Sequence, residues 1–226
     1  NEDTQVGNCI ISQEQTAGYG RKKSTWISLK GDLTATWKII GSETPTLDIQ
    51  SIHMASSLAI FNAICTWNGD VFQSTTWSND KSNNHYIKWP NDIFCSSTDT
   101  KIAGILLEAQ SKGNKISISC GIGINSRSRI VEGEMSGGVC EDGLEGLEKH
   151  VHIHLSSWFE NHERVPEVDT KFLHRRWWTV ASKSHIIGQT KKYDNRPCAV
   201  SELIDSGLVI YTKSGKTDFS IAEIGG

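Results

Sequence analysis

Apolar and polar residues alternate along several stretches of the chain, and this period of two predicts β-strands. The clearest case is 116–124, where isoleucine or cysteine at every even position alternates with serine and glycine. Leu33, Ala35, Trp37 and Ile39 alternate in the same way with threonines and a lysine. Shorter apolar runs at 9–11, 86–89 and 102–107 predict three more strands, the first of them buried. Because the last of these runs and 116–124 are joined by a turn at 112–114, we expect an antiparallel or mixed sheet, not a doubly wound one.

Other segments have helical spacing instead. An apolar stripe with residues three or four apart (Met54, Leu58, Phe61, Cys65) predicts a helix that the Asn-Gly-Asp at 68–70 ends. A second helix is expected within 144–159, a short third one over 172–178, and loops over 73–85 and 126–143.

The pattern changes again near the C-terminus. From Ser184 on, short alternating runs are separated by turns at 205–207 and 213–215. This change of period predicts a small β-barrel of roughly 40 residues. We therefore expect an α+β chain in two domains. Residues 1–182 would form a mixed sheet flanked by helices, and residues 183–226 the C-terminal barrel.

Composition narrows the class of protein. The 226 residues are 37% apolar and 22% charged, which is typical of a globular chain. A net charge of −3 gives no global basic field, so nucleic acid is not the expected partner. No segment has the apolar length of a membrane span, and the polar N-terminus is unlike a signal peptide. The six cysteines show no Cys-x-x-Cys spacing, so we expect reduced, buried thiols and a cytoplasmic protein, an organelle being possible.

The stretch 15–26 is the first candidate site. Gly18 and Gly20 permit positive φ and let backbone amides approach a ligand, while Arg21, Lys22 and Lys23 supply charge suited to phosphate. From the residues alone, a solvated basic turn is an equally good interpretation.

Two further candidates lie at strand ends. In Lys-Trp-Pro-Asn-Asp at 88–92, the proline fixes φ and would hold Asn91 and Asp92 at a defined edge, where Asp92 could bind a metal or polarise an amine. The alternative is an ordinary turn. Lys101, before Ile-Ala-Gly, could point its ammonium into a cleft, although lysines at strand ends usually lie in solvent.

The fourth candidate is Gly-Ile-Gly-Ile-Asn at 121–125. Glycines inside a strand indicate close approach of a ligand or of backbone, and Asn125 would lie at the strand end; tight packing on a helix is the alternative. A separate pair, His150 and His154, has the i,i+4 spacing of a zinc site. No third ligand is evident, so a histidine-bearing exposed helix is the preferred interpretation.

In their order and spacing, these four motifs resemble the biotin–protein ligases. The resemblance extends over nearly the whole chain, and its specific part is Lys-Trp-Pro-Asn-Asp followed by Lys-Ile-Ala-Gly at 101–104. It implies the class II synthetase-like fold of biotin and lipoate ligases, with an SH3-like C-terminal barrel. It also implies the family's chemistry, in which biotin and ATP with Mg²⁺ give biotinyl-5′-AMP, and a lysine of a carboxylase's biotin carrier domain then accepts the biotin. A homodimer is a further possibility, and the charge and hydropathy described above predict neither nucleic acid nor membrane as a partner.

The resemblance also assigns roles to residues. The catalytic residues would be Arg21, Lys101 and Asp92. Biotin would be held by Gln15, Gly18, Gly20, Trp26, Lys101, Ala103 and Gly104, with Ile102 in the apolar wall. The nucleotide would be held by Arg21, Lys22, Lys23, Asn91 and Asn125, and no residue is firmly assigned to a metal.

The chain departs from the family pattern in four places. Tyr19 stands where the family usually has arginine or lysine, and Lys22-Lys23-Ser24 lacks the glycine that many members carry. Leu29 replaces a usual proline, and no Ser/Thr-Asn segment is found before Cys9. Two alternatives therefore stay open beside an active biotin ligase. One is a lipoate or octanoate ligase-like enzyme, and the other is a non-catalytic protein that binds biotin or its adenylate.

Overall fold

A six-stranded antiparallel sheet forms the body of the molecule. The computed structural model describes residues 7–21, 24–42, 49–69, 84–88, 91–113, 115–159, 173, 177, 190–193, 196–204, 207–212 and 215–219. The strands are β1 (Cys9–Ser12), β2 (Leu33–Ser42), β3 (His85–Lys88), β4 (Asp92–Cys95), β5 (Thr100–Lys112) and β6 (Lys115–Ile124). Their order is β1-β2-β6-β5-β4-β3, and each neighbouring pair is antiparallel. Of the two arrangements expected, the antiparallel one is therefore correct.

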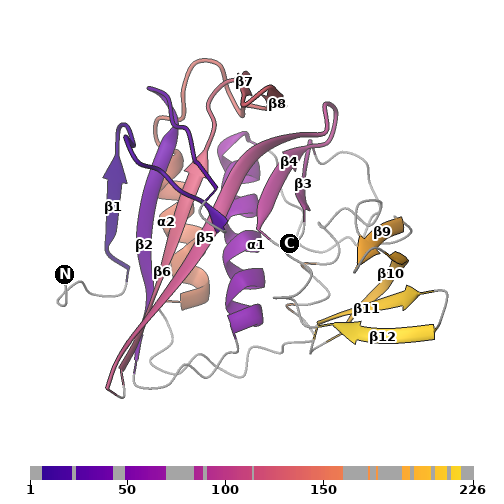
Figure 1. The fold of residues 1–226 in the computed structure, drawn as a ribbon. Coiled ribbons are helices and arrows are strands. Elements are labelled where there is room, and N and C mark those ends of the chain that lie inside the picture. Colours follow the sequence, from indigo (N-terminus) through magenta and orange to yellow (C-terminus); the bar gives the residue numbers. More distant parts are fainter. Residues whose placement is uncertain are drawn as a thin grey trace.

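Two helices, α1 (Ile49–Trp67) and α2 (Leu147–Phe159), cover one face of this sheet (Figure 1). The predicted stripe of α1 is buried, but so are residues between its members, such as Ala59 and Ile60. The reason is that α1 packs against the sheet on one side and α2 on another. On the opposite face, among the described residues, the segment 15–26 packs against the sheet through Trp26.

The period-two predictions are confirmed for the central strands. In β2 and β6, alternate residues such as Trp37 and Cys120 are buried in the core under the helices. The prediction for 9–11 was wrong in one respect, because β1 is an edge strand and Ile10 is 67% exposed. Three strands were missed. β4 begins at Asp92, the last residue of the predicted turn, and β7 (Arg129–Val131) and β8 (Glu134–Ser136) form a hairpin inside the predicted loop 126–143.

The histidines of α2 make a contact between the helices. His150 Nδ1 and His154 Nε2 lie 3.2 and 3.1 Å from Thr66 Oγ1 of α1, and both side chains are partly buried. The expectation of an exposed histidine-bearing helix is therefore wrong for these two residues, although His152 is exposed. The expected burial of the thiols also fails for Cys9, which is exposed.

The C-terminal part of the chain contributes a second antiparallel sheet. Its order is β12-β11-β10-β9, formed by Thr190–Tyr193 (β9), Arg196–Ile204 (β10), Gly207–Thr212 (β11) and Gly215–Phe219 (β12). Of the short helix predicted over 172–178, only Leu173 and Trp177 are described; both are helical and buried in the core. Within the described ranges, no helix combines the length and apolar character needed to cross a membrane.

Candidate functional site

The segment 15–26, here called the glycine loop, folds back on itself as a narrow hairpin. The amide of Trp26 donates to the Gly18 carbonyl at 2.9 Å, and the amide of Gly20 donates to the Ser24 carbonyl at 2.7 Å. A Cβ at Gly18 would lie 2.5 Å from the Trp26 carbonyl oxygen. Gly18 is therefore required by the approach of the loop to itself, whereas a Cβ at Gly20 would mainly meet the Ser24 hydroxyl, at 2.9 Å, which can turn away. Neither glycine has a positive φ.

Trp26, at the end of the glycine loop, lies flat against two strands. A Cβ at Gly123 would lie 2.3 Å from two carbons of the indole, and one at Gly104 would lie 3.1 Å from a third. Gly104 and Gly123 are register partners on β5 and β6. The close approach predicted from the glycines of 121–125 is thus made by a side chain of the protein itself at Gly123, whereas Gly121 has only ordinary contacts.

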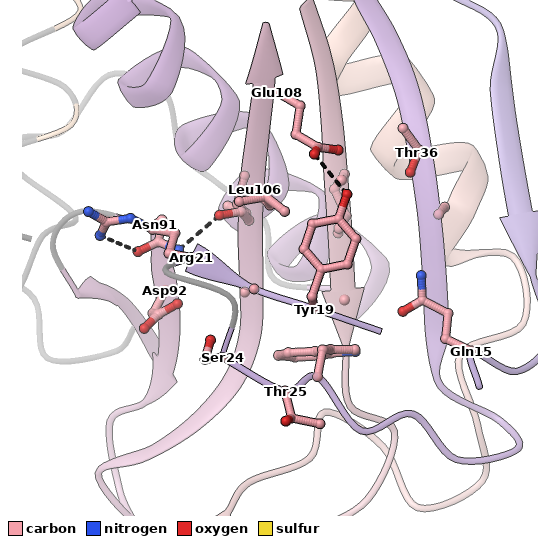
Figure 2. Close-up of a pocket in the computed structure, with 18 of the residues that line it drawn as sticks. Gln15, Tyr19, Arg21, Ser24, Thr25, Thr36, Asn91, Asp92, Leu106 and Glu108 are labelled. Atoms are coloured by element: carbon pink, nitrogen blue, oxygen red, sulfur yellow. Dashed lines mark hydrogen bonds between the residues drawn. The ribbon is translucent and has the colours of Figure 1, made fainter. Parts of the chain in front are cut away.

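Between the glycine loop and the sheet lies a cavity of about 300 Å³ (Figure 2). Its floor includes Thr36, Leu106 and Gly121 from three adjacent strands, beside the two glycines under Trp26. Cavities of this size are at the lower end of those that hold small organic ligands. The face of the sheet opposite α1 and α2 therefore carries a cavity large enough for a small organic molecule.

Lys101 and Asp92 meet at one end of this cavity. Lys101 Nζ lies 2.8 Å from Asp92 Oδ1 and 5.5 Å from the centre of the Trp26 ring. Both side chains are partly exposed, at 35% and 24%, so the ion pair is accessible to a ligand.

A β-bulge sets the direction of Lys101. On β4, Ile93 pairs with Ala103 and Phe94 with Lys101, so Ile102 is an extra residue in β5. Ile102 and Ala103 are consequently both buried, and the lysine before them reaches the cavity face. Without the bulge, Lys101 and Ala103 would share the face under the helices.

Arg21 joins the glycine loop to the start of β4. Its guanidinium Nη1 donates to Asn91 Oδ1 at 3.3 Å, and Asn91 Nδ2 donates to the Ile105 carbonyl at 2.9 Å. His53 of α1 has a pKa lowered to about 4, first because the imidazole is buried and second because the positive charge of Arg21 disfavours its protonated form. The site thus presents a cation, fixed by an amide, beside a neutral imidazole at neutral pH.

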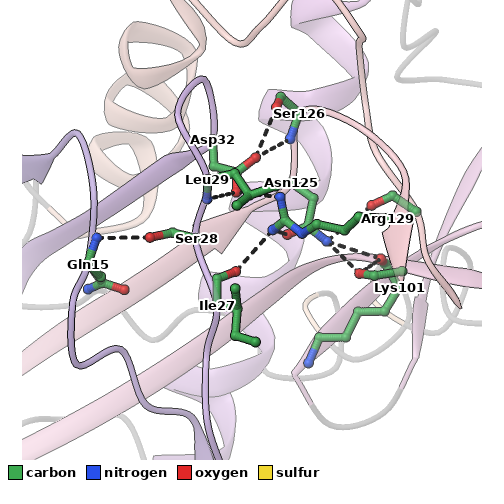
Figure 3. Close-up of polar contacts among 11 residues, drawn as sticks. Gln15, Ile27, Ser28, Leu29, Asp32, Lys101, Asn125, Ser126 and Arg129 are labelled. Carbon is green, nitrogen blue, oxygen red and sulfur yellow. Dashed lines mark hydrogen bonds and ion pairs between the residues drawn. The ribbon is translucent and has the colours of Figure 1, made fainter. Parts of the chain in front are cut away.

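Asn125 belongs to a separate polar cluster (Figure 3). Its amide nitrogen lies within hydrogen-bond distance of Ser136 Oγ at 2.8 Å and of the Gly137 carbonyl at 3.1 Å, and its oxygen accepts from Arg129. Arg129 Nη1 also lies 2.7 Å from Asp32 Oδ2, in an ion pair whose side chains are 10% and 1% exposed. This pair ties the loop after the glycine loop to the turn after β6.

The structure gathers most of the predicted site residues around one cavity. Its lining includes Gln15, Gly20, Arg21, Trp26, Asn91, Asp92, Lys101 and Gly104. Four predicted residues do not line it: Gly18 contacts Trp26, Ile102 and Ala103 are buried in the core, and Asn125 is in the neighbouring cluster. Lys22, Lys23, Trp89 and Pro90 lie outside the described residues.

Four further residues, one in the cavity wall and three beside it, were not identified from the sequence. Glu108 continues the cavity-facing row of Gly104 and Leu106 on β5 and accepts a hydrogen bond from Tyr19. The period of two along β5 was a signal that could have found it. His53 and the Asp32–Arg129 pair left no such signal, because their neighbours are far away in sequence.

Comparison with known proteins gives a consistent result. The model of the biotin/lipoate A/B protein ligase family matches residues 1–125. Biotin–protein ligase 2 of Arabidopsis thaliana is 32% identical over 120 residues, which cover 53% of this chain and 33% of that protein. The biotin–[acetyl-CoA-carboxylase] ligase of Paracoccus denitrificans is 27% identical over 117 residues, covering 51% and 43%. The matched region thus spans well under half the length of these relatives.

Solved structures share the fold over most of the chain. The biotin protein ligase of Aquifex aeolicus in complex with biotin and ATP superposes with a TM-score of 0.69 at 19% identity, covering 98% of this chain and 89% of that one. The biotin protein ligase of Leishmania major in complex with biotin gives a TM-score of 0.58 at 24% identity, covering 94% and 87%. At these identities the likeness establishes the fold of the antiparallel sheet and its helices.

Proposed function

Because the chain belongs to the biotin/lipoate A/B protein ligase family, we propose that it is an ATP-dependent biotin–protein ligase. It would form biotinyl-5′-AMP from biotin and ATP, and would then transfer biotin to a lysine of a carboxylase's biotin carrier domain. The observation that carries the proposal is the convergence of Arg21, Lys101 and Asp92 on one cavity of ligand size.

In the first step, an oxygen of the biotin carboxylate would attack the α-phosphorus of ATP. The bond from phosphorus to the bridging oxygen breaks, and pyrophosphate leaves. Two anions must meet in this step, so cations are needed where their oxygens come together. Arg21 and Lys101 supply two at the cavity wall, and Lys101 would exchange its contact with Asp92 for the ligand's oxygens.

In the second step, the amine of the acceptor lysine would attack the carbonyl carbon of the mixed anhydride. The bond to the AMP oxygen breaks and the nitrogen loses a proton. Asp92 would orient the amine and accept that proton, because it is the carboxylate beside Lys101 and is partly open to solvent.

The apolar part of biotin would lie on the sheet. Leu106 and the Gly121 backbone offer a floor for it, and Gln15 supplies polar atoms at the wall. Gln15 is held by its own backbone amide, which donates to Ser28 Oγ at 2.9 Å. Gly18, Ala103 and Asn125 would act indirectly, by shaping the glycine loop and β5.

Mg²⁺ would enter with ATP as part of the substrate. The described residues contain no group of three or more His, Cys, Asp or Glu side chains that could hold a metal ion. A magnesium ion bound to a nucleotide takes most of its oxygen ligands from phosphates and water.

The proposal also includes the organisation of the protein. Residues 1–182 would bind biotin and ATP, and the four-stranded C-terminal sheet would form part of an SH3-like barrel over 183–226. A cytoplasmic or organellar location and a possible homodimer follow from the family resemblance. Size-exclusion chromatography with light scattering tests the dimer, and limited proteolysis tests a boundary near 182.

Pyrophosphate release tests the proposed activity. Purified chain with ATP, Mg²⁺ and biotin should release pyrophosphate, and lipoate in place of biotin should not support release. Addition of a biotin carrier domain should yield the biotinylated domain. Release with lipoate alone would favour the lipoate ligase alternative, and calorimetric binding of biotin without release would favour the non-catalytic one.

A further inference from the structure

A hydrogen bond from Tyr19, on the first arm of the glycine loop, reaches the sheet across the cavity. Tyr19 Oη donates to Glu108 Oε1 at 2.8 Å, between residues 89 positions apart in the chain. Figure 2 shows the two side chains pointing toward each other, Tyr19 from the loop and Glu108 from β5. Both residues line the cavity.

The position of this bond follows from the register of the sheet. Along β5 the cavity-facing row runs from Gly104, covered by Trp26, through Leu106 to Glu108. Tyr19 pairs with Thr25 across the narrow hairpin of the loop, next to the pair of Gly18 and Trp26. The side chains of Tyr19 and Trp26 therefore start from neighbouring positions of the same hairpin. The cavity is therefore bounded by Trp26 at the Gly104 end of this row and by the Tyr19–Glu108 bond at the other end.

Two side chains on the first arm of the glycine loop thus bond to the sheet. Arg21 bonds to Asn91 at the start of β4, and Tyr19 bonds to Glu108 on β5. The Arg21 attachment uses a residue to which we assign a role in catalysis, whereas Tyr19 and Glu108 have no assigned role. Tyr19 is 55% exposed, so its bond can open and close without disturbing the core.

We propose that the Tyr19–Glu108 hydrogen bond is a latch that holds the glycine loop over the bound adenylate and lengthens its stay in the cavity. The inference rests on the proposed function and adds two positioning residues to it. A biotinyl adenylate must survive between the two steps, and a closed loop excludes the water that would hydrolyse it. A phenol that donates to a carboxylate is suited to this task, because the charged acceptor strengthens the bond while the phenol carries no charge that competes for phosphate.

The test uses Tyr19→Phe, which removes the donor and keeps the ring. Tyr86→Phe is the matched control, because Tyr86 also donates to a carboxylate, that of Asp99, but does not line the cavity. The first measurement is the rate of tryptic cleavage after Arg21 in the ligand-free chain. A net hydrogen-bond contribution of about 0.5–1.5 kcal/mol corresponds to roughly two- to tenfold faster cleavage in Tyr19→Phe, with no change in Tyr86→Phe.

The second measurement is the rate at which preformed biotinyl-5′-AMP leaves the protein, chased with unlabelled ligand and without carrier. Tyr19→Phe should raise this rate by about two- to tenfold, whereas the rate of adenylate formation should change by less than twofold. Glu108→Leu, which removes the acceptor oxygens, should have a similar effect, and the double variant with Tyr19→Phe should be no faster than either single one, since both changes remove the same bond.

The outcomes separate the latch from the proposed activity. Cleavage and release rates of Tyr19→Phe within twofold of the unmodified chain, or additive effects in the double variant, would overturn the latch. If the unmodified chain forms no adenylate, the proposed function fails. The cleavage rate of the ligand-free chain still decides whether Tyr19 and Glu108 hold the loop.

Discussion

Lys101 on β5 and Asp92 on β4 form an ion pair of 2.8 Å although the sheet register does not place them opposite each other. Asp92 pairs with Gly104, and Lys101 pairs with Phe94. The bulge at Ile102 brings the two charged groups together, on the face where the cavity lies. The pair thus places a cation and a general-base candidate side by side, as the two proposed steps require.

Replacement of the cation should mainly affect the first step. Lys101→Met should reduce the rate of adenylate formation on the order of 100-fold, as the loss of one preorganised charge-stabilising group typically does. The measurement is pyrophosphate release with saturating biotin and ATP. Lys115→Met, at an exposed position on β6, is the control and should keep full activity. Unchanged release in Lys101→Met, with the fold intact by circular dichroism, would remove Lys101 from the mechanism.

Replacement of the carboxylate should separate the two steps. Asp92→Asn keeps the size of the side chain but weakens its ability to accept a proton. Transfer of biotin from isolated biotinyl-5′-AMP to a carrier domain should fall more than adenylate formation does, with the difference growing smaller at high pH, where more of the acceptor amine is already deprotonated. An equal loss in both steps would mean that Asp92 acts only by holding Lys101.

The contact of Trp26 with the sheet leaves no room at Gly123. Gly123→Ala would place a Cβ about where two indole carbons now lie, at 2.3 Å, so Trp26 must move. Overpacking of this kind typically costs about 1–3 kcal/mol, measured as the free energy of unfolding in urea. Gly121→Ala is the matched control two residues away in β6: its nearest neighbour would be the Leu106 carbonyl oxygen at 3.4 Å, so its cost should be smaller. Equal effects of the two substitutions would contradict the tight contact at Trp26.

The Asp32–Arg129 ion pair should be sensitive to the loss of one partner. Asp32→Ala would leave the Arg129 guanidinium, 10% exposed, without its carboxylate. Breaking a buried pair in this way typically costs about 3–5 kcal/mol, whereas removing both charges costs less. Urea unfolding of Asp32→Ala and of Asp32→Ala with Arg129→Met tests this expectation. A single variant that loses less than the double variant would show that the pair does not hold the two loops together.

His53 should make stability depend on pH in a defined window. Its pKa of about 4 in the folded chain is below the ordinary value of 6.5, because burial and then Arg21 disfavour the charged form. The stability that this group contributes is fully present above pH 6.5 and is lost as the pH falls toward 4, because the unfolded chain then binds the proton more strongly. The loss should be about 3 kcal/mol at most. His53→Gln should remove this part of the dependence in urea unfolding between pH 4 and 7, and an identical slope in both proteins would contradict it.

The sequence by itself determined both long helices and most of the strands that form the core; β4, which carries the buried Ile93, was not predicted. The alternation in 33–39 and 116–124 and the stripe of 54–65 each put many apolar residues on one face. Burial of that face is strongly favoured, and in the strands a one-residue shift of register would expose it. The order of motifs likewise predicted that Gln15, Arg21, Asp92 and Lys101 belong to one site. The exposure of β1 escaped prediction, because an apolar run looks the same at the edge of a sheet as at its centre.

The tertiary structure decided how these residues meet. The bulge that directs Lys101, the indole on Gly123 and the Tyr19–Glu108 bond each depend on partners that are distant in the chain, or on a one-residue slip that no periodicity reveals. Asn125 shows the same limit, since its amide is committed to β8 and Arg129 and not to the cavity. The local pattern of apolar residues predicts which face of a strand or helix is buried. Which atoms come into contact depends on how strands and loops distant in the chain pack together.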